Sequence, residues 1–96
     1  MRVIDEISLE RQRQIEVEGW TAGHDDKHAR GEMARAAACY AMPDSFRDFK
    51  HRASLLWPWS REWWKPKDRR RDLIRAGALI VAEIERLDRK ARVWGR

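Results

Sequence analysis

Residues 55–92 read LLWPWSREWWKPKDRRRDLIRAGALIVAEIERLDRKAR, a tryptophan-rich and basic segment that runs into a long helical pattern. In the second half of this stretch, apolar residues recur at steps of three and four, the spacing of one face of an α-helix. They are Leu73, Ala76, Ile80, Ile84, Leu87 and Ala91. Three further apolar residues, Ile74, Leu79 and Val81, widen this stripe. The side opposite the stripe then consists of little more than Arg75, Ala78, Ala82 and Arg86. We therefore expect a helix over residues 68–93 with a wide apolar face buried at the centre of the protein.

Three other segments have helical patterns, and no segment shows the alternation typical of a half-buried strand. The three segments are residues 4–18, 25–42 and 45–56. The first has a thin apolar stripe, and its polar residues suit a wet or inter-subunit face; they are Glu10, Arg11, Arg13 and Gln14. The second is capped by Asp25 or Asp26, contains Gly31 as a weak point and ends before Pro43. Ser60 is expected to cap a single turn through Trp63. The predicted fold is one all-α domain over residues 1–96, with the long C-terminal helix at its centre.

The tryptophan content indicates a homo-oligomer or a binding pocket. Ninety-six residues form one domain with a modest core. Six tryptophans are more than so small a core easily encloses, so some should lie in a subunit interface or in a pocket. The long helix, which is apolar around most of its circumference, also indicates a homo-oligomer. We expect the chain to associate with copies of itself, and Trp20 to cover the small core.

Charge is distributed unevenly along the chain. The net charge is +5, but residues 1–26 carry 3 basic and 7 acidic residues, which gives −4. The remaining residues carry 18 basic and 9 acidic residues, which gives +9. An acidic head and a basic body can attract each other between subunits, or can separate a cation-binding end from an anion-binding end.

The single cysteine, Cys39, lies in an alanine-rich predicted helix and has no partner for a disulfide within the chain. This indicates a reducing compartment. No signal peptide is recognisable, and no apolar run of 18 residues is present to span a bilayer. We expect a cytoplasmic protein that does not bind membranes.

An acidic group near residue 25 is the first candidate site. His24, Asp25, Asp26, His28 and Glu32 are close in sequence, and Asp25 and Glu32 share one column of the predicted helix. With Glu83 from the long helix, these side chains can hold a divalent cation. The simpler interpretation is that the acids complement the helix dipole and that His28 pairs with Glu32 at i+4. We therefore predict no metal, and retain Asp25, His28, Glu32 and Glu83 as polar contacts for a ligand.

Two acids within the long helix, Glu83 and Asp88, interrupt its apolar surface. An unpaired buried carboxylate is costly, so each should find a cation, a metal or a neighbouring subunit.

A second candidate site combines tryptophans with basic residues. Trp57, Trp59, Trp63 and Trp64 are followed by a basic run near the start of the long helix, where the helix dipole does not favour positive charge. Indole rings stack on bases, and arginine binds phosphate with two donors. We therefore predict a site for a small phosphorylated nucleotide. Its residues are Trp63, Trp64, Lys65, Arg69, Arg70, Arg71 and Arg75, with Asp25, His28, Glu32 and Glu83 for the ribose. The alternative is that the tryptophans cover the core and that the arginines form a solvated helix start.

Signatures of catalysis are missing from the sequence. The serines Ser8, Ser45, Ser54 and Ser60 lie in no nucleophile elbow, and Cys39 lies among alanines. There is no glycine-rich phosphate loop and no paired-cysteine zinc spacing. We predict no catalytic residue and no cofactor, so a binding protein is favoured over an enzyme. Long nucleic acid is a less favoured partner because the head is acidic and no helix-turn-helix signature is present. A structural adaptor remains a further alternative.

Several segments together resemble a family of small phage- and prophage-encoded proteins. They are ERQRQIEVEGWTAGHDDKH, GEMARAAACYA and LLWPWSREWWKPKDRRRDLIRAGALIVAEIERLDR, which span most of residues 9–89. The resemblance implies a phage or prophage origin, and hence the cytoplasm of a bacterial host. Most members of the family have no characterised activity.

A second resemblance is to the all-α MazG-like nucleotide pyrophosphohydrolases, which bind metal through a Glu-Glu-x-x-Glu motif followed by Glu-x-x-Asp. Glu85 and Asp88 match the second motif, but the first does not occur, so Asp25, Asp26 and Glu32 would have to replace it. By functional analogy, phages also encode small homo-oligomers that trap the nucleotide signals of bacterial defence systems. We expect this chain to sequester such a signal, cyclic or of the ADP-ribose type, without cleaving it. Metal-dependent hydrolysis is the alternative.

Overall fold

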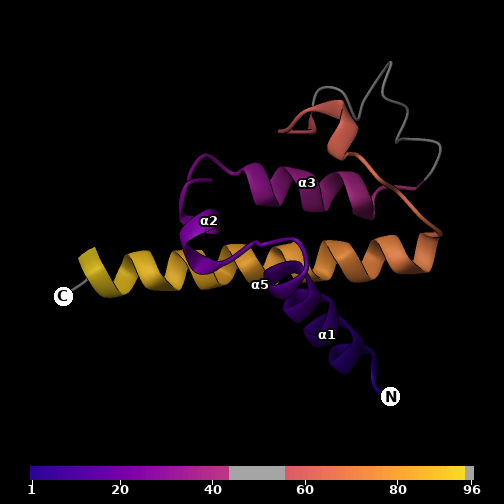
Figure 1. Cartoon of the computed structure of the whole chain (residues 1–96), viewed down its shortest axis with the longest axis horizontal. Helices are drawn as coiled ribbons and strands as arrows, with labels where there is room; N and C mark the ends of the chain where they lie inside the picture. Colours follow the sequence, from indigo (N-terminus) through magenta and orange to yellow (C-terminus); the bar gives the residue numbers. More distant parts are fainter. Residues whose placement is uncertain (44–55, 95–96) are drawn as a thin grey trace.

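A computed structural model describes residues 1–43 and 56–94, and every regular element in this part of the chain is helical (Figure 1). The elements are α1 (Val3–Glu16), α2 (Ala22–Asp26), α3 (Glu32–Ala41), the short 3₁₀ turn η2 (Arg61–Trp63) and α5 (Arg69–Trp94). The predicted all-α fold with a long C-terminal helix is confirmed, and so is the single turn after Ser60. The helix predicted for residues 45–56 falls almost entirely outside the described residues.

Helix α5 is the element on which the others are assembled. Figure 1 shows α3 lying alongside α5, whereas α1 projects obliquely from it and α2 lies near the crossing of α1 and α5. The contact between α3 and α5 is the most extensive, followed by that between α1 and α5. Within the described residues, no helix has both the length and the apolar character needed to cross a membrane.

The predicted helix over residues 25–42 is wrong in one respect, because it is two helices. The first begins at Ala22, since the Thr21 hydroxyl accepts a hydrogen bond from the His24 N–H at 3.3 Å and caps the helix before either aspartate. The second begins after Gly31, whose φ of 83° is left-handed. A left-handed residue cannot continue an α-helix, and glycine adopts this conformation at the least cost.

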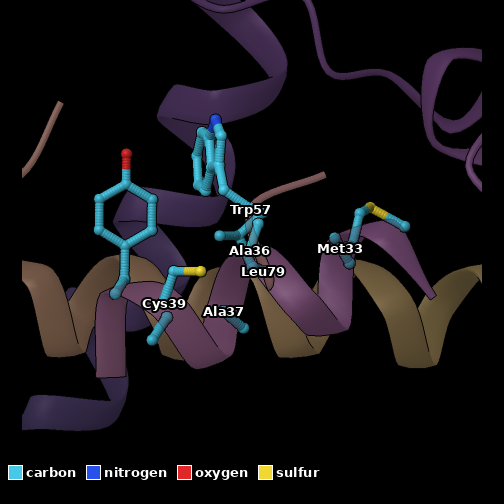
Figure 2. Close-up of a cluster of buried hydrophobic side chains, with 9 residues drawn as sticks. Met33, Ala36, Ala37, Cys39, Trp57 and Leu79 are labelled. Carbon is cyan, nitrogen blue, oxygen red and sulfur yellow. The ribbon is translucent and has the colours of Figure 1, made fainter. Parts of the chain in front are cut away.

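The core lies between α3 and α5, and the side chain of Trp57 packs on it (Figure 2). Alanines on both helices allow their backbones to approach closely, and the larger Met33 and Leu79 fill the remaining space. The buried residues are Met33, Ala36, Ala37, Cys39, Tyr40, Trp57, Ala76, Leu79 and Ala82. Trp20 is partly buried against this cluster, as expected. Burial raises the pKa of the Cys39 thiol to about 11, so it is a packed side chain and not a reactive one.

The prediction of which face of α5 is buried is only partly correct, because Ile74, Ala76 and Leu79 are buried but the large residues of the central stripe are not. Leu73, Ile80, Ile84 and Leu87, the large members of the predicted core stripe, are 43%, 49%, 52% and 48% exposed. The side predicted to be polar is instead buried, because Ala78, Ala82 and Arg86 pack beneath the other helices. Two features explain the inversion. The alanine-rich α3 fits best against small residues, and α1 approaches α5 with polar side chains that pair with charges on α5.

Helix α1 packs through a polar face, which was expected to be wet or to lie between subunits. Glu10, Arg11 and Gln14 are all buried. Arg11 donates to Glu85 on α5 at 3.0 Å, and Arg71 on α5 donates to Glu10. An apolar contact also joins the two helices, because the Ile7 side chain of α1 packs against Gly77 of α5. A Cβ at position 77 would lie only 3.0 Å from Cδ1 of Ile7.

Candidate functional site

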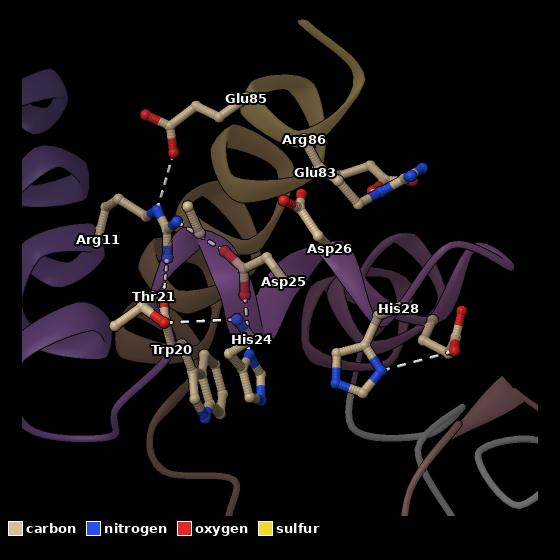
Figure 3. Close-up of polar contacts among 12 residues, drawn as sticks. Arg11, Trp20, Thr21, His24, Asp25, Asp26, His28, Glu83, Glu85 and Arg86 are labelled. Atoms are coloured by element: carbon tan, nitrogen blue, oxygen red, sulfur yellow. Dashed lines mark hydrogen bonds and ion pairs between the residues drawn. The ribbon is translucent and has the colours of Figure 1, made fainter. Parts of the chain in front are cut away.

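The acidic side chains singled out in the sequence lie near α2, and Asp25, Asp26 and Glu83 form ion pairs with arginines (Figure 3). Nη2 of Arg11 lies 2.7 Å from Oδ2 of Asp25, whose side chain is completely buried. Nη2 of Arg89 lies 2.8 Å from Oδ1 of Asp26. These two bonds join α2 to α1 and to α5, so Asp25 and Asp26 stabilise the packing of the three helices.

Glu83 and Glu32 have partners of their own. Nε of the buried Arg86 lies 2.7 Å from Oε1 of Glu83, so Glu83 has a cation as its partner, one of the outcomes expected from the sequence. His28 Nδ1 lies 3.5 Å from Oε2 of Glu32, the i+4 pair expected from the sequence. Burial by itself would raise the pKa of Glu32, but backbone hydrogen bonds and His28 outweigh it, and the pKa is lowered.

A divalent cation at this group would have to displace these arginines. No three His, Cys, Asp or Glu side chains within residues 1–43 and 56–92 are arranged to hold a metal ion. The group is thus a network of ion pairs with no open coordination site. Asp88, from the hydrolase-like Glu-x-x-Asp, is exposed to solvent.

The arginines at the start of α5 do not gather at one site. Arg69 donates to the Met42 carbonyl at 2.8 Å, and Arg70 donates to both carboxylate oxygens of Glu6 at 2.7 and 2.5 Å. Arg71 is bonded to Glu10. Consecutive residues of a helix point about 100° apart, so these arginines leave α5 in different directions. Arg69 binds the C-terminal end of α3, whereas Arg70 and Arg71 bind two carboxylates of α1.

The two adjacent tryptophans also have different roles. The ring of Trp64 lies 4.9 Å from that of Tyr40 and 5.0 Å from that of Trp57, measured between centroids, and it packs against the core. Trp63 is 52% exposed. Of the predicted pair, Trp63 therefore has a ring face accessible to a ligand.

A cavity of about 450 Å³ opens beside Trp63 and is lined mainly by aromatic rings. The lining residues are Glu18, Trp20, His24, His28, Trp57, Trp59, Ser60 and Trp63. We call this the aromatic cavity. The Trp20 and His24 rings are parallel within 4° at 5.9 Å, and the Trp59 ring lies 6.0 Å from Trp20 and 5.3 Å from His28. The indole N–H of Trp59 is buried and has no hydrogen-bond acceptor among the described residues.

A second, smaller cavity of about 60 Å³ adjoins the first, and its lining includes three cations and two carboxylates. We call it the basic cavity; its lining residues are Glu10, Arg13, Gln14, Glu18, Trp20, Tyr40, Trp63, Lys65, Arg75 and Leu79. Glu18, Trp20 and Trp63 line both cavities, so they form the boundary between them. Lys65 Nζ lies 5.5 Å from the centre of the Trp63 ring.

Two polar groups of the basic cavity are buried without a partner in the described part of the chain. They are Oε1 of Gln14 and Nε of Arg75. Gln14 is 2% exposed, and a buried amide oxygen normally accepts a hydrogen bond. Arg75 uses Nη1 to donate to the Lys65 carbonyl at 2.5 Å, and its guanidinium lies 5.8 Å from the Tyr40 ring. The basic cavity thus offers one free acceptor and one free donor.

The structure therefore brings together a subset of the predicted binding residues. Trp63, Lys65, Arg75 and His28 border the two cavities, whereas Trp64, Arg69, Arg70, Arg71, Asp25, Glu32 and Glu83 do not line either of them. The prediction missed Arg13, Gln14, Trp20 and Trp59. A signal was available for two of these residues, because Trp20 and Trp59 are additional tryptophans in a chain with more of them than its core needs.

Comparison of the chain with protein families, with curated proteins and with solved structures finds no match.

Proposed function

We propose that this protein binds a small phosphorylated nucleotide, with its base in the aromatic cavity and a phosphate at the basic cavity. The observation that carries the proposal is the shared boundary at Trp20 and Trp63, where a stacking surface adjoins a cluster of cations. A nucleotide has the same division into a flat ring and an anionic group. The volume of about 450 Å³ lies in the range typical of small-molecule sites.

The aromatic cavity supports the base-binding part of the proposal. Trp63 has an exposed ring face, and Trp20 and Trp59 are tilted walls on which a second face can rest. Stacking of a base on an aromatic side chain contributes about 1–3 kcal/mol. The unpartnered indole N–H of Trp59 gives the cavity a donor for a ring nitrogen or a carbonyl of the base.

The basic cavity supports the phosphate-binding part. Lys65 and Arg75 line it, and Nε of Arg75 is a donor without an acceptor among the described residues. Arg13 also lines the cavity, but its guanidinium already binds Glu10 and Glu18. Hydrogen bonds to charged groups contribute about 1.5–3 kcal/mol each. Together with stacking, two such bonds bring micromolar affinity within reach, since 1 µM corresponds to about −8.2 kcal/mol.

We further propose that the nucleotide is held without being cleaved. Support comes from the acidic group, where Arg11, Arg86 and Arg89 already neutralise the carboxylates that a metal-dependent hydrolase would need. The resemblance to phage-encoded proteins then suggests a physiological role, which is to sequester a cyclic or ADP-ribose-type signal of bacterial defence. We propose that it acts in the cytoplasm of a bacterial host as a homo-oligomer.

Isothermal titration calorimetry against cyclic dinucleotides, cyclic ADP-ribose isomers and linear ADP-ribose tests the proposal. We expect at least one of them to bind with a dissociation constant below about 100 µM, or roughly −5.5 kcal/mol. Trp63→Ala should weaken that binding by about 5- to 150-fold, since it removes one stacking face. Leu9→Ala, at an exposed position that lines neither cavity, is the matched control and should bind like wild type.

Two results would count against the proposal. If none of the panel binds below about 100 µM, the sequestration role is wrong. If a ligand binds but mass spectrometry of the recovered material shows it cleaved in the presence of Mg²⁺ or Mn²⁺, and Glu83→Gln abolishes the cleavage, the protein is a hydrolase.

A further inference from the structure

Helix α5 has an apolar face that the fold leaves exposed within the described residues. It is formed by Leu73, Ile80, Ile84 and Leu87, each between 43% and 52% exposed. Their spacings of seven, four and three residues place all four on one stripe, about 20 Å long at 1.5 Å per residue. Because α1, α2 and α3 pack elsewhere on α5, this stripe has no cover within the described part of the chain. A contiguous apolar stripe of this kind marks an interaction surface.

The order of residues along the stripe is nearly symmetric about its centre. Leu73 and Leu87 each lie seven residues from Ile80. If a second copy of α5 is laid antiparallel across the first with a two-fold axis beside Ile80, Leu73 of each copy faces Leu87 of the other. The two Ile80 side chains then meet at the axis. A two-fold interface requires this kind of self-complementarity.

The charges beside the stripe fit the same arrangement. Arg70 and Asp88 are 18 residues apart, about five full turns, so they lie on the same edge of the stripe at its two ends. In an antiparallel two-fold pair, this edge of one stripe lies beside the same edge of the other stripe. The N-terminal end of one helix is then next to the C-terminal end of the other. Arg70 lies ten residues before Ile80 and Asp88 eight residues after it, so Arg70 of one copy lies within about 3 Å, along the axis, of Asp88 of the other.

The side chains at this edge are available for such a pair. Asp88 is exposed, and the Arg70 side chain is 63% exposed while it binds Glu6. Helix α1 extends the apolar surface on this side, because Ile7 packs on Gly77 and Ile4, one turn earlier, is 64% exposed.

We propose that two copies of this chain associate through α5, antiparallel and related by a two-fold axis next to Ile80. Leu73, Ile84 and Leu87 pack across the interface, and Arg70 and Asp88 pair between subunits. The self-complementary order of the stripe and its charges favours a second copy over an unrelated protein or a membrane surface. This proposal does not depend on nucleotide binding.

Sedimentation equilibrium of the whole chain tests the association. We expect wild type at 100 µM to have twice the chain mass of 11.5 kDa. Ile80→Glu places two carboxylates against each other at the axis and should weaken the dimer at least 100-fold, so that the mass falls to that of one chain. Leu9→Glu, which replaces an aliphatic residue of similar exposure on α1, should leave the dimer intact. Circular dichroism checks that both variants keep the helical fold.

Cysteine cross-linking tests the direction of packing and does not rely on a destabilised variant. Leu73→Cys and Leu87→Cys proteins are mixed and joined with a short bifunctional maleimide, while the native Cys39 is buried. Antiparallel packing predicts linked heterodimers of the two variants. Linked homodimers of each variant would instead show parallel packing and overturn the arrangement. A monomeric wild type, or an Ile80→Glu protein that stays dimeric, would overturn the interface itself.

Discussion

At the scale of single residues, the main feature of this protein is that charged side chains are buried and bound to one another. Glu10 is 2% exposed and accepts hydrogen bonds from Arg13 and Arg71. Burial by itself would raise the pKa of Glu10, but the hydrogen bonds from Arg13 and the charges of Arg13 and Arg71 outweigh it and lower the pKa below the ordinary 4.5. Such pairs favour one arrangement of α1 on α5, since a single missing partner leaves a buried charge.

Glu10 should therefore make stability depend on pH in the acid range. Because its pKa is lower in the folded state, its contribution is complete above pH 4.5 and is lost as the pH falls through the folded value. Glu10→Gln should reduce the free energy of unfolding at pH 7 by about 1–3 kcal/mol. The same substitution should also make the free energy of unfolding decline less steeply below pH 4.5. Urea unfolding between pH 3 and pH 7 measures both effects. The exposed Glu62→Gln is the control, and an unchanged pH profile in Glu10→Gln would contradict this role.

Single residues also explain why the sequence predicted the candidate site only in part. Adjacent letters such as Trp63 and Trp64 look equivalent, but one faces a cavity and the other packs on Tyr40. A basic run is typical of phosphate binding whether or not its members have acidic partners elsewhere in the chain. Arg70 and Arg71 have such partners in α1, 60 or more residues away, and pairing at that separation cannot be read from local sequence.

At the scale of elements, periodicity predicted where the helices lie. The errors concern one helix break, which depends on a backbone angle, and one buried face, which depends on how the helices pack. Arg69–Trp94 form one helix, close to the predicted residues 68–93, since the periodic pattern is strong enough to continue through Gly77. The break between α2 and α3 depends on the left-handed Gly31, and a sequence shows the glycine but not its φ angle. The buried face of α5 was misassigned because the side with the largest aliphatic residues is the natural choice for a core, whereas the alanine-rich α3 packs on the small residues of α5.

A pair of glycine substitutions tests the break between α2 and α3. Gly31→Ala should lower the free energy of unfolding by about 1–2 kcal/mol, because an alanine is strained at a φ of 83°. Gly23→Ala is the matched control inside α2. There a Cβ would meet only the Thr21 hydroxyl at 4.0 Å, and the change should be neutral or stabilising by up to about 1 kcal/mol. Thermal unfolding of the two variants measures the difference, and a Gly31→Ala protein as stable as wild type would show that the break does not need glycine.

At the scale of the whole molecule, helix α5 contributes both to the basic cavity, through Arg75 and Leu79, and to the exposed apolar stripe. Helix α1 contributes Arg13 and Gln14 to the basic cavity, while its first turns lie beside the exposed stripe of α5. Among the tryptophans, Trp63 is exposed, whereas Trp20 and Trp59 pack against the core and also line the aromatic cavity. The cations that lie next to these tryptophans depend on how α1 packs on α5. The amino-acid composition does not predict that packing.

The most direct test of nucleotide binding at the shared boundary of the two cavities is a ¹⁵N–¹H spectrum of the indole N–H groups. Signals are assigned by single Trp→Phe substitutions and followed during titration with the nucleotide that binds in calorimetry. We predict large shifts for Trp20, Trp59 and Trp63, with Trp59 moving downfield as its unpartnered N–H gains an acceptor. Trp57, whose N–H already donates to the Ser60 carbonyl at 3.0 Å, should move less. If a saturating nucleotide leaves the signals of Trp20, Trp59 and Trp63 in place, the ligand binds elsewhere and the proposed site is wrong.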